Sequence, residues 1–252
     1  MKVTILGCGT SGGVPRIGNE WGACDPDNPK NRRRRCSILV ENEGTEVLID
    51  TSPDIRDQLL DTGTTRLDGV VWTHEHADQC HGIDELRVLA IRNRERVNVW
   101  GNKITLDVLM RRFDYCFTQL NGSPYPAILK EHFIEGPFSI GNIDFIPFDQ
   151  DHGSVISLGF RMGAIGYSND LVNLDDHGFE ILEGVDTWIV DAMRYTPHPT
   201  HVNVETALKW IERLKPRRAI LTNMHVDLDY ETLKSELPEG VEPAYDGMVI
   251  EA

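Results

Sequence analysis

The segment 73–82 constrains this chain more than any other part of the sequence. It reads Thr-His-Glu-His-Ala-Asp-Gln-Cys-His-Gly and follows an apolar run, Leu67–Trp72, that predicts a buried strand. His74 and His76 are two residues apart, so an extended backbone can present both imidazoles to one ion, and Asp78 adds a carboxylate oxygen. A surface loop with incidental histidines is the alternative, but this combination after a strand favours a metal centre for Zn²⁺, Mn²⁺ or Fe²⁺.

The order of the other segments predicts a mixed α/β fold. Two β-rich runs, Ser37–Glu41 and Glu46–Asp50, flank a turn-forming stretch and predict a hairpin. The clearest helix is Val204–Lys215, with Asn203 as its N-cap. Such an order predicts two packed sheets with helices outside, and chemistry just past the strand ends. The other expected strands are Lys2–Leu6, Asn98–Trp100, Ile143–Pro147, Ile156–Arg161, Ala164–Tyr167, Thr187–Val190 and Ala219–Thr222, and the other expected helices run from Ser52 to Gly63, from Gly82 through Ala90 and from Tyr230 to Leu237.

The composition argues against several classes of protein. The 252 residues carry 25 Lys+Arg against 40 Asp+Glu, and the net charge of −15 argues against broad capture of nucleic acid or anionic lipid. No apolar run approaches the ~18 residues that span a bilayer, and Lys2 opens a strand rather than a signal peptide. The five cysteines are odd in number and widely spaced, which argues against a disulfide framework. We expect a cytoplasmic protein with a single domain over residues 1–252.

The histidine segment resembles the signature His-x-His-x-Asp-His-x-x-Gly of the metallo-β-lactamase superfamily, including the strand and threonine that precede it. Further ligand residues follow in the expected order, so the resemblance covers essentially the whole chain. It implies an α/β fold, a four-layer αβ/βα sandwich, and a metal-dependent hydrolase with a binuclear site. By this resemblance the first metal ion is held by His74, His76 and His152, the second by Asp78 and His225, and Asp170 bridges the two.

Gln79 departs from the signature, because it stands where the family has its third histidine. An amide oxygen can coordinate a metal, but it is neutral and a poorer donor than imidazole. His81 does not replace it, since two residues along a helix turn a side chain by about 200°. The resemblance thus implies two divalent ions, Zn²⁺ or Mn²⁺, with a weaker or differently selective second site that includes Gln79. Asp50 resembles the early Asp of the family, which orients the ligand residues.

The N-terminal loop indicates which branch of the superfamily the chain resembles. Gly7-x-Gly9-x-x-Gly12 matches the dinucleotide fingerprint superficially, but a proline and a long polar loop follow where a helix must open. Instead, Trp21–Pro26 and Asn31–Ser37 resemble the phosphoribosyl 1,2-cyclic phosphate phosphodiesterase branch. Some members bind a structural zinc through extra cysteines in this loop. Only Cys24 remains here, so we expect no such zinc.

His201 precedes the long helix and matches, by its position relative to Asn203, the general acid of phosphodiesterase relatives. The implied mechanism has a metal-bound hydroxide attacking phosphorus, Asp78 in the catalytic set, and His201 protonating the leaving alkoxide. The implied substrate is a small, cyclic or nucleotide-like phosphodiester. A histidine at the start of a helix that simply bonds the backbone is the alternative for His201.

The block Arg32–Arg35 has two interpretations that stay open. Alternate side chains of an extended segment point to opposite faces, so at most two of the four can address one site. They could bind a phosphate or carboxylate of the substrate, or pair with nearby acids. The candidate substrate contacts are Arg34, Arg194 and Ser168.

Two rival functions remain. A nuclease of the ribonuclease Z type shares the fold and motif, but the segment between Asp107 and Phe138 contains acids, aromatics and prolines rather than a lysine-rich arm. A non-catalytic carrier on the same fold is the other. We expect a small phosphodiester as partner, no long nucleic acid and no membrane, and a homodimer stays open.

Overall fold

The computed structural model describes residues 1–119 and 121–251, so residues 120 and 252 of the predicted domain lie outside it. Its strands form two seven-stranded sheets. In the first sheet the order is β14-β1-β2-β3-β4-β5-β6, antiparallel from β14 to β3 and parallel from β3 to β6. Its strands are β1 Lys2–Gly7, β2 Ser37–Asn42, β3 Thr45–Ile49, β4 Gly69–Val71, β5 Val97–Gly101, β6 Leu129–Phe133 and β14 Val249–Glu251.

The second sheet has the order β13-β12-β11-β10-β9-β8-β7. It is antiparallel from β7 to β10 and parallel from β10 to β13. Its strands are β7 Phe138–Ile140, β8 Ile143–His152, β9 Val155–Met162, β10 Ile165–Ser168, β11 Thr187–Asp191, β12 Arg218–Thr222 and β13 Val241–Pro243.

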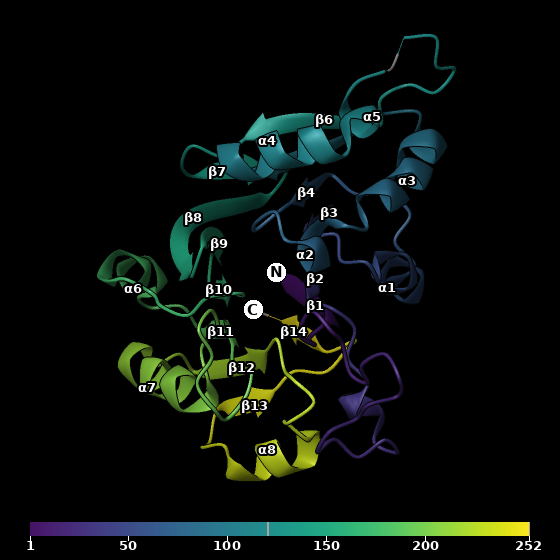
Figure 1. Ribbon diagram of the computed structural model, residues 1–252. Coiled ribbons are helices and arrows are strands. Elements are labelled where there is room, and N and C mark those ends of the chain that lie inside the picture. Colours follow the sequence, from purple (N-terminus) through teal and green to yellow (C-terminus); the bar gives the residue numbers. More distant parts are fainter. Residues whose placement is uncertain (120, 252) are drawn as a thin grey trace.

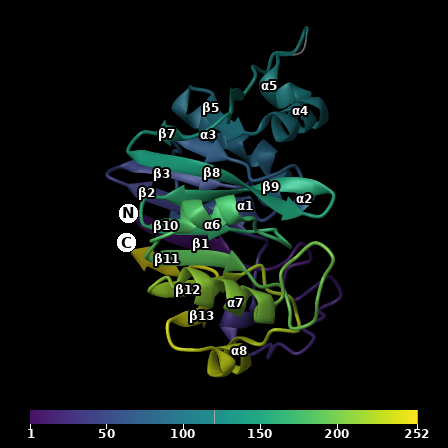
Figure 2. The same ribbon diagram turned by 90° about the vertical axis from the view of Figure 1, so that its left-hand side faces the viewer.

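Helices cover the outer faces of both sheets. In Figure 1, α1 and α3 lie on one outer side and α6 and α7 on the other, and Figure 2 shows α6 and α7 in front of the second sheet. The predicted four-layer sandwich is therefore confirmed. The helices are α1 Ile55–Thr62, α2 Ala77–Cys80, α3 Leu86–Asn93, α4 Lys103–Arg112, α5 Asp114–Phe117, α6 Asp176–Leu182, α7 Val204–Leu214 and α8 Tyr230–Glu236, with 3-10 turns at Pro29–Asn31 and Ile83–Glu85.

Strand periodicity explains how the first sheet serves two cores. Ile38 and Val40 on β2 enter the core between the sheets, whereas Leu39 between them packs against the outer helices. The inter-sheet core is completed by aromatic side chains of the second sheet, among them the fully buried Phe160 and Tyr167. Because the central strands are buried on both faces, their sequences are continuous apolar runs.

The structure differs from the sequence expectation at the edges of the sheets. The helix expected from Gly82 begins as a 3-10 turn, Ile83–Glu85, and continues as α3, and β8 continues past Pro147 to His152. The segment between Asp107 and Phe138, for which no element was expected, contains the end of α4, all of α5 and β6. On β6 the exposed Lys130 and Glu131 follow the buried Leu129, so this edge strand lacks an alternating pattern.

The five cysteines are all buried free thiols, which agrees with the expected lack of a disulfide framework. Within residues 1–119 and 121–251, we find no helix that is both long and apolar enough to cross a bilayer.

Candidate metal centre

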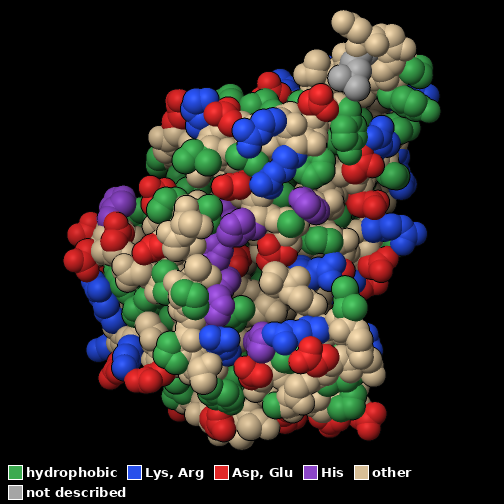
Figure 3. Space-filling model, viewed as in Figure 1, with side chains coloured by type: hydrophobic (Ala, Val, Ile, Leu, Met, Phe, Trp, Pro, Cys, Tyr) green, Lys and Arg blue, Asp and Glu red, His purple; other side chains and the backbone are tan. Residues whose placement is uncertain are grey.

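The predicted site residues lie where strands of both sheets end. Asp50 follows β3, His74 lies shortly after β4, His152 ends β8, and Asp170 and His225 follow β10 and β12. Histidine side chains accordingly gather in the middle of the face shown in Figure 3. The carboxyl ends of parallel strands meet at one edge of a sheet, which explains this convergence.

Three histidines form a compact cluster. The Nε2 atom of His74 lies 3.0 Å from Nδ1 of His76, which lies 3.3 Å from Nε2 of His152. The ligand atoms of the three rings are all within 4.8 Å of one another. Three ring nitrogens this close together can all direct their lone pairs at one cation. The cluster therefore fits a divalent ion such as Zn²⁺, for which imidazole is a preferred ligand.

Neighbouring groups fix two of these rings. The carboxylate of Asp50 accepts hydrogen bonds from the backbone N–H (2.8 Å) and hydroxyl (2.9 Å) of Thr73. That hydroxyl oxygen lies 3.0 Å from Nδ1 of His74 and accepts its proton, while Nδ1 of His152 donates to the Thr200 carbonyl at 2.8 Å. Both rings thus keep Nε2 free as a ligand atom. This is the geometry that the predicted orienting role of Asp50 requires.

Burial favours neutral imidazoles in the cluster. It lowers the pKa of His74 well below its usual range, and the neighbouring His152 lowers it further. Burial and the neighbouring His201 lower the pKa of His152 to about 4. A neutral ring can offer its lone pair to a metal at neutral pH. Burial, and then the Asp78 carboxylate, raise the pKa of Asp170.

His201 faces a buried carboxylate. Its Nδ1 atom lies 2.8 Å from Oδ2 of Asp191, a residue with no exposed surface, and its ring centroid is 4.8 Å from that of His152. Burial lowers the pKa of His201, but Asp191 outweighs this effect and raises the pKa to about 9. The side chain therefore bonds a carboxylate beside the cluster, rather than the backbone at the start of α7. His201 also forms a second possible metal-ligating group with His152 and Asp170.

Three residues just past strand ends adopt left-handed backbone conformations. The φ angles are +65° at Asp50, +54° at Asp170 and +60° at Asn223. Residues other than glycine rarely adopt such angles, which persist where surrounding contacts hold them. The contacts here are hydrogen bonds within the site: Asn223 Nδ2 donates to Asp170 Oδ1 and Asp191 Oδ2, each at 3.2 Å.

The residues predicted for a second ion are arranged differently. Among the described residues, His225 belongs to neither of the two groups that could hold a metal. Its Nε2 atom contacts the guanidinium of Arg16. Gln79 turns its amide NH₂ toward acids, with Nε2 2.8 Å from Asp170 Oδ2 and 3.4 Å from Asp78 Oδ2. These residues do not form an open set of lone pairs for a cation.

The arginine block is engaged by acids and backbone. Arg34 pairs with Asp246 (3.1 Å) and Asp61 (2.8 Å), and Arg35 pairs with Asp54 at 2.9 Å. This arrangement favours the acid-pairing interpretation of the block. The remaining two side chains also have partners: Arg33 is buried on the carbonyls of His225 and Leu228, and Arg32 lies over the ring of Trp21.

The other two candidate substrate contacts support local structure. Arg194 donates to the carbonyls of Thr196 (3.1 Å) and Pro197 (2.7 Å), within the loop that leads to His201. Ser168 is buried and accepts a hydrogen bond from Trp188 Nε1 at 3.0 Å. The substrate roles of Arg34, Arg194 and Ser168 stay predictions.

Sequence reasoning missed several residues of the site. Asp191 ends the apolar strand β11 and Asn223 follows β12, so the rule that such folds place their chemistry at strand ends could have found them. Thr200 contributes only its carbonyl and Arg16 lies in a long loop, and neither has a pattern in the sequence.

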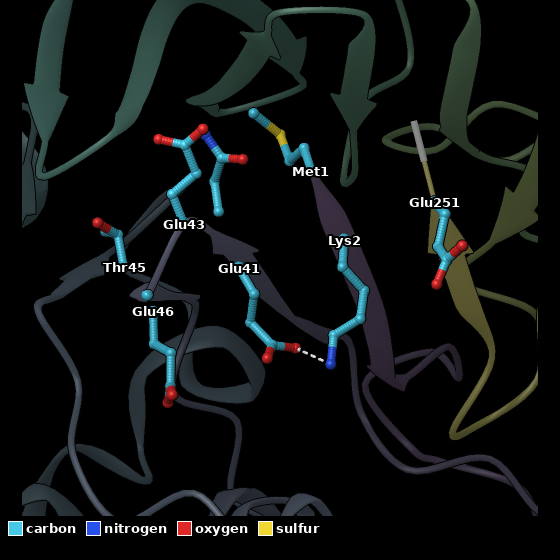
Figure 4. A pocket seen from close by; sticks show the side chains of 9 residues that line it. Met1, Lys2, Glu41, Glu43, Thr45, Glu46 and Glu251 are labelled. Carbon is cyan, nitrogen blue, oxygen red and sulfur yellow. Dashed lines mark ion pairs between the residues drawn. The ribbon is translucent and has the colours of Figure 1, made fainter.

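A hollow lies at the end of the first sheet opposite the three-histidine cluster. Figure 4 shows it at the start of β1 and around the β2–β3 turn. Its side chains include Glu43, Glu46 and Glu251, and the only ion pair drawn there joins Lys2 to Glu41 at 2.6 Å. It contains no histidine or cysteine, so the chemistry of metal binding belongs to the three-histidine cluster instead.

Gly82 holds the metal-binding segment against the chain after β3. A Cβ atom there would collide with the Ser52 carbonyl and lie 3.1 Å from the Thr51 carbonyl oxygen. We expect Gly82→Ala to reduce the free energy of unfolding by about 1–3 kcal/mol, as overpacking does. Urea denaturation measures this loss. Gly136→Ala is the control, since nothing lies within 4 Å of its Cβ position, and equal losses in both variants would contradict the prediction.

Comparison with known proteins identifies the family. The family model of the beta-lactamase superfamily domain matches residues 45–224, which include the whole three-histidine cluster. The chain belongs to the metallo-β-lactamase superfamily. Within it, the chain is similar to a solved structure described as a new diphosphatase from the PhnP family, with 34% identity, 99% of this chain and 96% of that chain covered, and a TM-score of 0.92. The predicted family and branch are thereby confirmed.

Other proteins similar to this chain have different names. An octanoyltransferase of Porphyromonas gingivalis is 32% identical over 98% of this chain, but the chain spans only 51% of that protein's length. Zinc-bound PqqB of Methylobacterium extorquens has a TM-score of 0.79 at 17% identity, with both chains fully covered, and therefore shows the shared fold alone.

Proposed function

We propose that this chain is a metal-dependent hydrolase of small phosphodiesters. The observation that carries the proposal is the pairing of His201 with the buried Asp191 directly beside the three-histidine cluster. A relative described as a diphosphatase, at 34% identity over nearly the whole chain, supports phosphoryl chemistry. The net charge of −15 disfavours long nucleic acids as substrates and leaves small esters.

His74, His76 and His152 would hold a divalent ion, Zn²⁺ or Mn²⁺. When bound, such an ion supplies Lewis acidity to a phosphoryl oxygen and lowers the pKa of water. Nδ1 of His201 is hydrogen-bonded to Asp191, so Nε2 is the nitrogen that can donate a proton to the leaving oxygen. Asp191 keeps the ring oriented and stabilises its protonated form.

The experiment is a substrate panel with metal-free protein reloaded with Zn²⁺ or Mn²⁺. It contains bis-4-nitrophenyl phosphate, a 2′,3′-cyclic nucleotide, a cyclic ribose phosphate, a diphosphate ester and precursor tRNA. We expect metal-dependent cleavage of one or more small esters and none of the tRNA. Cleavage of tRNA alone would favour the ribonuclease Z alternative. No turnover of any substrate with either metal would favour a carrier.

The diphosphate ester represents a second candidate substrate, because the PhnP-family relative is described as a diphosphatase. A cyclic diester releases an alkoxide, whereas a diphosphate releases a phosphate, which needs less help from an acid. A His201→Ala variant that loses activity on the cyclic ester but keeps it on the diphosphate would show that the acid serves the diester.

A further inference from the structure

The two predicted metal positions differ in whether their ligand side chains already have partners within the protein. At the first position, one ring nitrogen each of His74, His76 and His152 faces the other two. The second should be formed by Asp78, Gln79 and His225, with Asp170 shared. Each of these side chains has a partner from the protein itself, as described next.

Gln79 presents hydrogens where an ion would need lone pairs. Its Nε2 atom lies 2.8 Å from Asp170 Oδ2 and 3.4 Å from Asp78 Oδ2. Turning the amide over would place its oxygen against both carboxylates, so repulsion fixes the NH₂ on this side. The side chain is 1% exposed and cannot swing into solvent. The Oε1 atom, turned away, has no hydrogen-bond partner among the described residues.

His225 has both ring nitrogens engaged. Nε2 accepts from the Arg16 guanidinium, and Nδ1 lies 3.0 Å from Oδ2 of Asp227. A guanidinium carries a permanent positive charge and repels a metal ion that approaches the same nitrogen. Among the described residues Arg16 forms one ion pair, with Glu20 at 3.5 Å on the solvent side.

The Arg16–His225 pair lies next to the loop that carries His201. The backbone N–H of His225 donates to the Met193 carbonyl at 2.9 Å, and the N–H of Met193 donates to the Val202 carbonyl at 3.0 Å. Arg16 therefore brings a fixed positive charge to the same edge of the sandwich as the three-histidine cluster. Guanidinium groups bind phosphate oxygens well.

We propose that the chain holds one divalent ion tightly, and that Gln79 and Arg16 exclude a second one, with Arg16 supplying the second positive charge for an anionic substrate. This inference rests on the proposed metal-dependent function. The second site, which the sequence predicts to be weaker, is then closed to a metal ion. Arg16 binds the substrate there instead.

Metal stoichiometry tests the proposal without relying on activity. Protein stripped with chelator is titrated with Zn²⁺ and with Mn²⁺ by calorimetry, and metal per chain is measured by mass spectrometry after desalting. We expect one ion per chain in the wild type and two in Gln79→His/Arg16→Gln. Gln119→His, which adds an imidazole at an exposed position, controls for binding by the new histidine alone and should hold one.

Arg16→Gln alone covers the case in which the double variant fails to fold, because Arg16 lies in a partly exposed loop. It should raise affinity for a second Zn²⁺ by about 10-fold or more, the size of effect seen for groups around metal ligands. It should also raise KM for bis-4-nitrophenyl phosphate while the first ion stays bound.

The outcomes separate this inference from the proposed function. Two tight ions in the wild type would overturn the inference and leave a hydrolase. One ion in both the wild type and the double variant would overturn the role of Gln79 and Arg16. No bound ion in the wild type would overturn both proposals.

Discussion

Replacing His201 with alanine is expected to slow cleavage of phosphodiesters with alkyl-like leaving groups by about 10²–10⁴-fold, the usual contribution of a general acid. Alkoxides are poor leaving groups and need the proton that the ring, paired with Asp191, can hold. A 4-nitrophenolate leaves without that proton, so the same variant should lose less than about 10-fold on the activated ester. Steady-state kinetics on both substrates with the same loaded metal measures the contrast.

His198→Ala is the matched control for this experiment. Its ring lies 5.1 Å from that of His201 between centroids, but its Nδ1 atom only accepts from Thr200. We expect similar rates for His198→Ala and the wild type on both esters. Equal losses of His201→Ala on the two esters would rule out an acid role and indicate that the ring helps to bind metal or substrate.

Removing the metal is expected to lower the melting temperature markedly. If the free ion is present at about 1,000 times its Kd, binding stabilises the folded state by about 4 kcal/mol. For a domain of this size each kcal/mol corresponds to about 2–4 °C, so the shift should be about 8–16 °C. Thermal unfolding followed by circular dichroism, with and without chelator, measures it.

Variants of single histidines show whether the shift arises at the cluster. His76→Ala removes one of the three converging nitrogens and should abolish the metal-dependent shift. His177 lies exposed on α6 and pairs with Glu180, away from the cluster, so His177→Ala should keep the full shift. A shift that persists in His76→Ala would place the stabilising ion elsewhere.

Much of this fold and the composition of its site were predictable from local pattern. The apolar run before His74 and the capped helix α7, where Asn203 accepts from Thr206 N–H at 3.1 Å, are encoded by neighbouring residues. Asp170 and His225 were found through the order of ligand residues in the family that the chain resembles, and each follows an apolar strand. The strand and the helix depend on a few adjacent residues, which is why sequence reasoning reached them.

What sequence reasoning missed depends on contacts between distant segments. Arg16 and His225 are 209 residues apart, and no periodicity links the loop after β1 to the end of β12. The orientation of the Gln79 amide is set by Asp170, 91 residues away, so the sequence showed a poorer ligand but not a donor turned toward acids. Edge strand β6 was missed because charged side chains replace the alternating pattern.

The three-histidine cluster draws on both sheets, and this has a consequence for how the molecule assembles. His74 and His76 follow a strand of the first sheet, whereas His152 ends a strand of the second, 76 residues further along the chain than His76. A nascent or partly folded chain therefore has no complete binding site in either half. The ion can be captured fully only after the two halves have docked, so nearly all of its binding energy is available to hold them together.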